Sequence, residues 1–198
     1  MAYSILRIDA SIKQEGSVSK DLTRDIVAKL VAAHPDADVT TRDLAAHPAR
    51  ETDGAWLGAV HTPADQRTQE QSVLAAESDT LIAEIKQADT IVIGLPIYNF
   101  AVPSQIKIWL DQMARAGETF KYTENGRIGL VENTRAIVAY SAGGTRMGSD
   151  IDFASGYLRH MLGFFGITDV QFVAADQGVV DPDQSLIAAN TAIQELVA

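Results

Sequence analysis

A hydroxyl-rich segment near the N-terminus has the side chains needed to bind a phosphate group. It follows an apolar run at residues 3–8 and contains Ser11, Ser17 and Ser19, with Gly16 between them. Serine hydroxyls and the free N–H groups of a helix N-terminus both donate hydrogen bonds to anions. A serine in front of a helix is, however, often a simple N-cap. Taken alone, the segment leaves both interpretations open.

Two further segments place aromatic residues or glycines directly after an apolar run. Tyr98, Asn99 and Phe100 follow the apolar residues 89–95 and lie between two prolines. Their rings and backbone amides suit a planar heterocycle, but the rings could equally pack beneath the loop. The Ser-Ala-Gly-Gly sequence at residues 141–144 lets backbone N–H groups approach a ligand closely, and it also suits a tight turn.

Several other kinds of active site are excluded by the residues that the chain lacks. It has no cysteine, so thiolate nucleophiles, disulfides and cysteine metal sites are absent. The histidines, which are His34, His47, His61 and His160, have no metal-ligand spacing. Neither a G-x-G-x-x-G fingerprint nor a P-loop is present. We therefore expect no metal and no catalytic side chain, and we expect a bound cofactor to carry the chemistry.

Charge and hydropathy argue against nucleic acids and membranes as partners. The chain has 16 basic and 26 acidic residues and a formal net charge of −10, which is unsuited to binding polyanions. No apolar run approaches the roughly 18 residues of a membrane span, and the N-terminus lacks the layout of a signal peptide. We expect a cytoplasmic protein in which local donors, and no general positive field, bind any phosphate.

The segments described above are connected by alternating strand-like and helix-like patterns. The strand-like runs are residues 3–8, 37–44, 89–95, 135–140 and 170–174. Helical periodicity covers residues 18–31, 66–87, 103–116 and 150–165, and a last helix begins at Pro182. Gly166 is the expected stop of the fourth helix, and residues 45–65 look irregular.

This alternation predicts one α/β domain over residues 1–198, with a doubly wound parallel sheet of five strands. Parallel neighbours need helical crossovers, so strands separated by helices pair in parallel. Ligands bind such sheets beyond the carboxyl ends of the strands. All three segments described above follow strand ends, and this joint placement favours one ligand site over three unrelated turns.

The chain resembles the bacterial FMN-dependent NADH:azoreductase and quinone reductase family. The resemblance rests on residues 96–104, 114–123, 141–144 and 162–169, and it extends over nearly the whole chain. It implies a flavodoxin-like fold with strand order 2-1-3-4-5, FMN as cofactor and NADH or NADPH as electron donor. It also implies a homodimer in which the partner chain helps to build each active site.

The resemblance further implies a role for individual residues. The FMN phosphate is held by Ser11, Ser17, Val18 and Ser19. The isoalloxazine ring is lined by Pro96, Ile97, Tyr98, Asn99 and Phe100, and its pyrimidine side is contacted by Ser141, Ala142, Gly143 and Gly144. The substrate pocket is shaped by Asn99, Phe120, Tyr122 and Phe165. Ala142 stands where some relatives have a larger polar or basic residue, which leaves the acceptor preference open.

The activity that the resemblance implies is transfer of two electrons from NAD(P)H to quinones and aromatic azo compounds by a ping-pong mechanism. An electron carrier without its own turnover is an alternative, because the negative charge would suit docking to basic protein partners. Residues 120–129 and the irregular stretch near residue 50 indicate a more elaborate pocket and favour the enzyme. A receiver domain is disfavoured, since only Asp9 provides a carboxylate at the end of the first strand.

Overall fold

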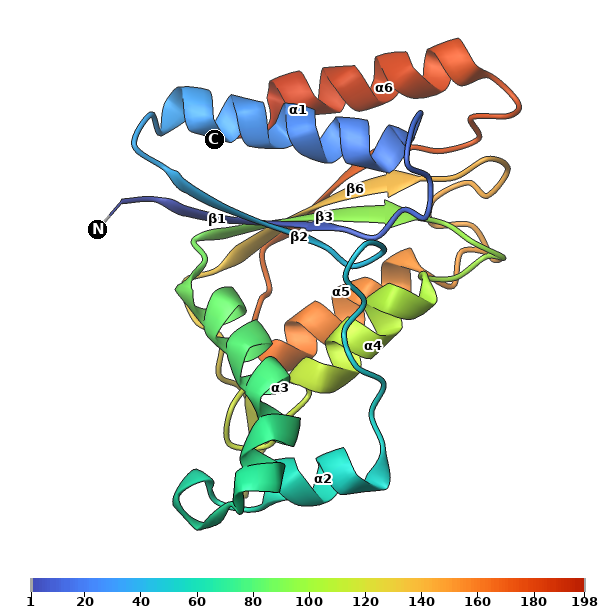
Figure 1. The fold of residues 1–198 in the computed structure, drawn as a ribbon. Coiled ribbons are helices and arrows are strands. Elements are labelled where there is room, and N and C mark those ends of the chain that lie inside the picture. Colours follow the sequence, from blue (N-terminus) through green and yellow to red (C-terminus); the bar gives the residue numbers. More distant parts are fainter. Residues whose placement is uncertain (1, 198) are drawn as a thin grey trace.

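A parallel sheet lies between two layers of helices (Figure 1). The computed structural model describes residues 2–197. Its strands are β1 (Ser4–Asp9), β2 (Asp38–Asp43), β3 (Thr90–Pro96), β6 (Arg135–Ser141) and β7 (Val170–Ala175). They pair in parallel in the order β2-β1-β3-β6-β7. The predicted parallel sheet of five strands is confirmed.

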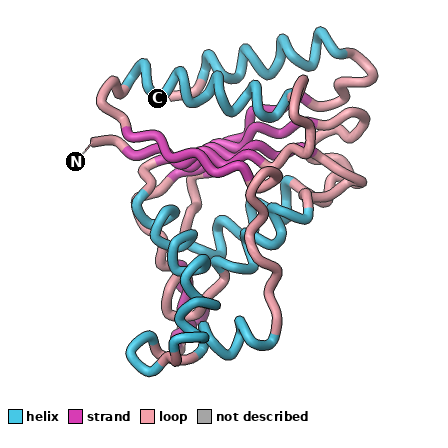
Figure 2. The backbone as a smooth tube through the Cα atoms, viewed as in Figure 1, coloured by secondary structure: helices cyan, strands magenta, loops and turns pink. Residues whose placement is uncertain are grey.

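Two short strands outside this sheet were not predicted. β4 (Phe120–Thr123) and β5 (Gly126–Gly129) pair as an antiparallel ribbon that lies away from the sheet, beside the lower helices (Figure 2). Strands of four residues are too short for a clear alternation of polar and apolar residues. When the ribbon is left out of the count, the neighbours within the main sheet are those of the expected order 2-1-3-4-5.

The helices cover both faces of the sheet, as helical crossovers require. They are α1 (Val18–Ala33), α2 (Gly54–His61), α3 (Gln69–Gln87), α4 (Ser104–Met113), α5 (Ser155–Phe165) and α6 (Pro182–Glu195). Helices α1 and α6 lie on one face, whereas α3, α4 and α5 lie on the other (Figure 1). Leu22, Ile26 and Leu30 form the buried stripe of α1, which explains their spacing of four residues.

Three helix boundaries differ from the predicted ones. Residues 45–65, expected to be irregular, contain α2, because the Asp53 carboxylate accepts a hydrogen bond from the Trp56 N–H and caps that helix. Pro103 is the N-cap residue of α4 and not its first helical residue. α5 begins at Ser155 and not near residue 150, because turns occupy the preceding residues.

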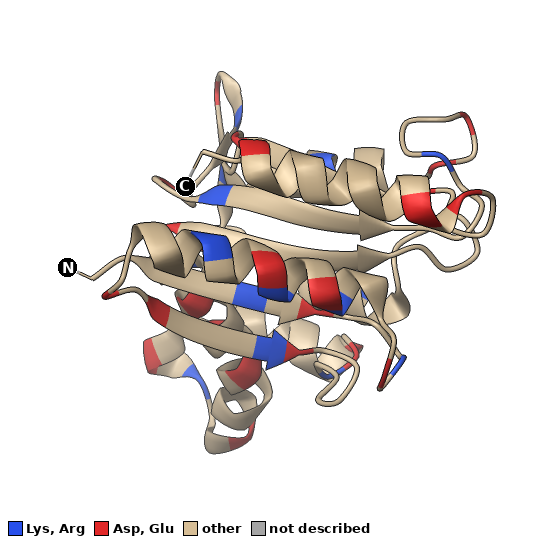
Figure 3. Cartoon of the chain, turned by 90° about the horizontal axis from the view of Figure 1, so that it is seen from above, with Lys and Arg blue, Asp and Glu red and all other residues tan. Residues whose placement is uncertain are grey.

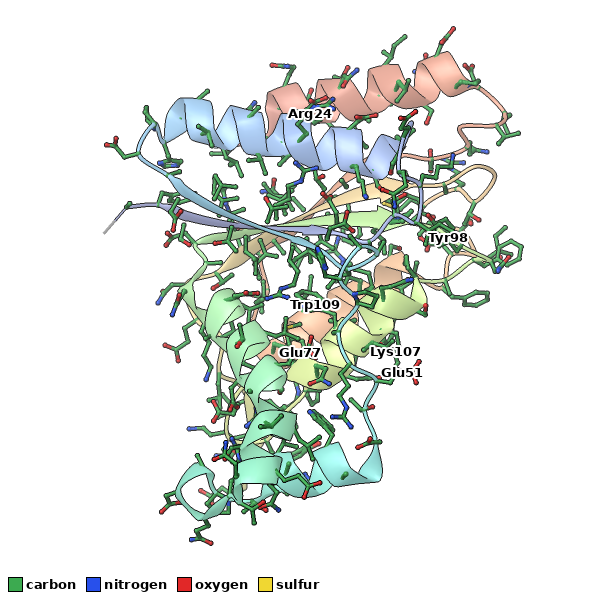
Figure 4. All side chains as sticks on the ribbon, viewed as in Figure 1. Arg24, Glu51, Glu77, Tyr98, Lys107 and Trp109 are labelled. Atoms are coloured by element: carbon green, nitrogen blue, oxygen red, sulfur yellow. The ribbon has the colours of Figure 1, made fainter. Side chains whose placement is uncertain are left out.

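The interior is built around β3, which is buried at every position. A strand covered on both faces is expected to be apolar without alternation, and this explains the run at residues 89–95. Below the sheet, Trp109 of α4 is completely buried between the sheet and the helices (Figure 4). No helix within residues 2–197 is long and apolar enough to cross a membrane. Basic and acidic residues are interspersed along the elements seen from above (Figure 3).

The end of α5 generates a prediction about stability. Gly166 terminates the helix with φ 114°, and a Cβ atom there would lie 2.7 Å from the Val131 carbonyl oxygen. Gly166→Ala should therefore lower the free energy of unfolding by about 1–3 kcal/mol, measured by urea denaturation. Gly163→Ala is the matched control, because a Cβ atom at Gly163 meets nothing within 4 Å. Equal urea midpoints for the two variants would contradict this account of the helix end.

Candidate functional site

A cavity of ≈ 270 Å³ lies beside the N-terminus of α1 and the carboxyl ends of β3 and β6. All three predicted segments contribute to its lining, with Ser11, Ser17 and Val18 from the first, Pro96, Ile97 and Tyr98 from the second, and Ser141, Ala142 and Gly143 from the third. Segments separated by more than a hundred residues therefore meet at one edge of the sheet, because every strand there points in the same direction.

The N-terminus of α1 supplies hydrogen-bond donors to one end of the cavity. Ser17 is the N-cap, and its hydroxyl oxygen accepts a hydrogen bond from the Lys20 N–H at 3.4 Å. The first N–H groups of the helix, from Val18 onward, have no carbonyl partner within the helix. Ser17 thus caps the helix and also lines the cavity, so the two interpretations of this serine are compatible. Ser19 is buried and does not line the cavity.

Tyr98 links the loop after β3 to the loop after β1. Its hydroxyl oxygen accepts a hydrogen bond from the Ile12 N–H at 3.2 Å and lies 3.4 Å from the Ser11 hydroxyl. The Ser11 hydroxyl also accepts from the Lys13 N–H at 3.3 Å. Figure 4 shows Tyr98 at the edge of the molecule where the strands end. The ring of Tyr98 is therefore held in place by contacts at its far end.

The tip of the loop after β3 has a strained backbone. Tyr98 and Ala101 exchange two backbone hydrogen bonds of 3.2 and 3.1 Å around Asn99 and Phe100, which have φ values of 50° and 71°. Two-residue turns of this kind favour Asn-Gly, and a bulky residue at positive φ costs about 1–3 kcal/mol. Neither residue lines the cavity, and Phe100 is 51% exposed.

The glycine-rich loop after β6 is held by the segment that follows β7. The Ala142 N–H donates to the Ala175 carbonyl at 3.1 Å, and the Val179 N–H donates to the Gly143 carbonyl at 2.9 Å. A Cβ atom at Gly143 would lie 3.1 Å from the Val179 side chain, so glycine leaves room for that contact. Gly144 lies outside the cavity lining.

Part of the cavity lining was not predicted from the sequence. These residues are Ala175, Gly178, Val179, Pro182, Ser185 and Leu186, and Lys13, which from the sequence could equally be a solvated surface charge, lines the cavity as well. Most of them follow β7 or begin α6, and the end of the fifth predicted strand was the signal that could have identified them. The same rule about carboxyl ends applies to that strand as to the other three.

The aromatic residues expected to shape a substrate pocket do not line this cavity. Phe120 is largely buried with its ring centroid 4.4 Å from that of Phe164, and Tyr122 is 74% exposed. Phe165 is completely buried in the core, because it lies on the face of α5 that packs inward. The Phe165 ring is enclosed within this chain, and its expected role in the substrate pocket stays a prediction.

Two titratable groups beside the site have shifted pKa values. Burial, and then the negative charges of Asp152 and Asp176, raise the pKa of the Tyr140 phenol, so this buried group stays neutral. Burial alone would raise the pKa of Asp152, but hydrogen bonds from Gly148, Ser155 and Ala154 outweigh it and hold that pKa below 3.8. Within residues 2–197, no cluster of three or more His, Asp or Glu side chains could hold a metal ion.

Known proteins match this chain over nearly its whole length. A family model described as "Flavodoxin-like fold" matches residues 4–197. The chain is 58% identical over 195 residues to FMN-dependent NADH:quinone oxidoreductase 1 of Jannaschia sp. (strain CCS1), covering 98% of each chain. It is 52% identical over 195 residues to the FMN-dependent NADH:quinone oxidoreductase of Cereibacter sphaeroides (strain KD131 / KCTC 12085), covering 98% of this chain and 99% of that relative.

A solved structure shows the same similarity. It is an FMN-dependent NADH-azoreductase from Bacillus anthracis str. Ames Ancestor in complex with FMN. The TM-score is 0.87 at 27% sequence identity, and the match covers 98% of this chain and 97% of the other.

Asp152 provides a pH-dependent test of the loop that precedes α5. Its carboxylate accepts hydrogen bonds from the N–H groups of Gly148, Ala154 and Ser155, and the neighbouring Phe153 N–H donates to the Phe100 carbonyl. A pKa lowered by folding stabilises the protein above the unfolded pKa, and this stabilisation is lost as the pH falls through the folded value. Asp152→Asn should therefore lower the free energy of unfolding by about 1–2 kcal/mol at pH 7.

The difference in the free energy of unfolding between the wild type and Asp152→Asn should narrow as the pH falls below about 4, because the wild-type carboxylate then becomes neutral as well. Urea denaturation at pH 7, 5 and 3 measures this difference. Asp150→Asn, which changes an exposed carboxylate in the same loop, is the control and should show little effect. A difference between wild type and Asp152→Asn that does not vary with pH would refute this role of the carboxylate.

Proposed function

Because the chain belongs to the flavodoxin-like family of FMN-dependent NADH:quinone oxidoreductases, we propose that it binds FMN at the carboxyl edge of the sheet and reduces quinones with NADH. The observation that carries this proposal is the meeting of three loops around one cavity, with a helix N-terminus at one end and a glycine-rich loop at the other. Aromatic azo compounds are further proposed acceptors, in view of the similar azoreductase structure.

The chemistry of the cavity fits a phosphate joined to a planar ring. At one end are the hydroxyls of Ser11 and Ser17, the helix N-terminus and the side chain of Lys13. The other walls include apolar side chains, such as those of Ile97 and Val179. A helix N-terminus with neutral donors binds a phosphate without requiring a broadly positive surface. This matters for a chain with a net charge of −10.

We assign the proposed contacts as follows. The phosphate is held by the hydroxyls of Ser11 and Ser17 and the backbone N–H groups of Val18 and Ser19. The ring is lined by Pro96, Ile97 and Tyr98, with Asn99 and Phe100 at its rim, and Ser141, Ala142, Gly143 and Gly144 lie toward its pyrimidine side. The buried position of Ser19 favours its backbone over its hydroxyl as the donor.

When bound, FMN supplies the redox chemistry by accepting two electrons from NADH or NADPH and passing them to the acceptor in a ping-pong sequence. The role of the protein in this proposal is to bind and orient the cofactor and the substrates. In this proposal the backbone N–H groups of the glycine-rich loop, Gly143 first and Gly144 beside it, would stabilise negative charge on the bound ring, as in an oxyanion hole. The neutral Tyr140 phenol adds no charge beneath the site. The acceptor's protons come from water in this proposal, and no Asp, Glu or His side chain is among the described residues that line the cavity.

The proposed substrate pocket requires a second copy of the chain. Phe120 and Tyr122 belong to the ribbon of β4 and β5, which lies away from the cavity in this chain. Tyr122 and Ile128 of this ribbon are exposed to the extent of 74% and 46%. We propose a homodimer in which each ribbon helps to cover the partner's FMN site, and we propose that the enzyme acts in the cytoplasm, where NADH is available.

The absorbance spectrum and turnover of the purified protein test the proposal directly. We expect the visible spectrum of oxidised flavin after reconstitution with FMN, and oxidation of NADH when menadione or methyl red is added. Initial rates at several concentrations of both substrates should give the parallel double-reciprocal lines of a ping-pong mechanism. A protein that binds FMN but turns over neither acceptor would instead be an electron carrier, and a protein that binds no FMN would remove the basis of the proposal.

Lys13 and Lys20 are two possible sources of positive charge near the proposed phosphate site. The Lys20 ammonium is 2.7 Å from the Asp43 carboxylate, whereas Lys13 lines the cavity. Lys13→Gln should therefore raise the Kd of FMN about three- to tenfold and leave the Kd of riboflavin, which has no phosphate, unchanged. Quenching of flavin fluorescence measures both values. Lys29→Gln, in the distant half of α1, makes the same change in net charge and should affect neither flavin. An equal loss of affinity for both flavins would argue against a phosphate contact.

A further inference from the structure

A buried carboxylate at the end of β1 is hydrogen-bonded to α1, the helix whose N-terminus is the proposed phosphate site. Asp9 is the last residue of β1, is 4% exposed and does not line the cavity. Its two oxygens have separate partners, with the Thr23 hydroxyl donating at 2.7 Å and the Arg7 guanidinium at 2.8 Å. A buried charge is costly unless it is paired and hydrogen-bonded. These two partners satisfy the Asp9 carboxylate, but Asp9 has no role in the FMN binding or the redox chemistry proposed above.

The partners of Asp9 hold the first turn of α1. The Thr23 hydroxyl and the Arg7 guanidinium both lie 3.0 Å from the Lys20 carbonyl oxygen. Lys20 is also fixed at its N–H by the Ser17 hydroxyl and at its ammonium by Asp43 of β2. Contacts from β1 and β2 therefore converge on the residue that follows Val18 and Ser19, whose N–H groups are the proposed phosphate donors.

β3 leaves the space that these contacts need. A Cβ atom at Gly94 would lie 3.2 Å from the Asp9 carboxylate and 3.2 Å from the Thr23 methyl group. Either side chain would have to shift for any larger residue at this position. The Asp9 backbone is fixed as well, since its carbonyl oxygen accepts a hydrogen bond of 2.7 Å from the Leu44 N–H.

We propose that Arg7, Asp9 and Thr23 form a clamp that positions the first turn of α1 and thereby makes the cavity selective for a phosphorylated flavin. The inference rests on the proposed FMN site. Hydrogen bonds weaken steeply with displacement and misalignment, so donors aimed at a phosphate must be held by supporting contacts. Arg7 also balances the charge of Asp9, so the carboxylate does not repel a nearby phosphate. These three are positioning residues, because none of them is among the residues that line the cavity.

Thr23→Val tests the clamp, because it removes the hydroxyl and keeps the branched shape. We expect the Kd of FMN to rise about tenfold, with less than about a twofold change for riboflavin. Thr23→Ser retains the hydroxyl and should restore FMN affinity. Thr191→Val is the matched control, because the Thr191 hydroxyl donates to the Ile187 carbonyl in α6, away from the clamp. It should leave both flavin affinities unchanged.

The ratio of the two affinities separates positioning from simple stabilisation. If Thr23→Val lowers the urea midpoint but leaves the ratio of FMN to riboflavin affinity unchanged, the clamp is structural and the inference is overturned. Failure of Thr23→Ser to restore the ratio overturns it too. If Thr23→Val does not fold, Gly94→Ala is the alternative variant, because its methyl group displaces the clamp from the side of β3. It should lower the ratio of FMN to riboflavin affinity, and an unchanged ratio refutes the inference. A wild-type protein that binds both flavins equally, or neither, refutes the proposed phosphate site itself.

Discussion

The parallel pairing of β3 with β1 on one side and β6 on the other is the interaction on which the rest of this structure depends. Parallel strands run in the same direction, and each is followed by a crossover that returns the chain to the starting edge. All three strands therefore end at the same edge of the sheet. The loops that follow them must therefore meet, although they are far apart in the sequence. Complete burial of β3 makes this edge rigid, since any displacement of the strand would disturb helices on both faces of the sheet.

The site combines this rigidity with local donors in place of a strong positive field. In an acidic chain, a phosphate must be met by hydroxyls, backbone N–H groups and a helix dipole. Such donors act only over short distances, so their positions must be well fixed. The contacts of Tyr98 with the first loop, of Val179 with the glycine-rich loop and of Thr23 with Asp9 all serve this end. The strained turn at Asn99 and Phe100 is stable for the same reason, because the surrounding loops determine its conformation.

The lower half of the molecule has a different character. α2 packs against α3 beyond the edge of the main sheet, and the ribbon of β4 and β5 lies beside the same layer (Figures 1 and 2). Exposed apolar residues, of which Tyr122 is the largest, occur on this ribbon. One chain therefore carries the cavity and the aromatic ribbon at separate places. In the proposed homodimer, the ribbon of one chain would lie beside the cavity of the other, and the proposed active site would then belong to the dimer.

The strands of the main sheet, the helices that cross over between them and the edge at which the three loops meet can all be predicted from the amino-acid pattern, because hydrophobic periodicity and the direction of parallel strands are local or topological properties. The side chains that reach the cavity cannot be predicted in this way. Ser17 and Lys13 line it, whereas Ser19 is buried and Lys20 is paired with Asp43. Phe165 faces the core, and the segment after β7 completes the cavity. Burial and pairing depend on neighbours that are distant in the sequence, so no local pattern specifies them.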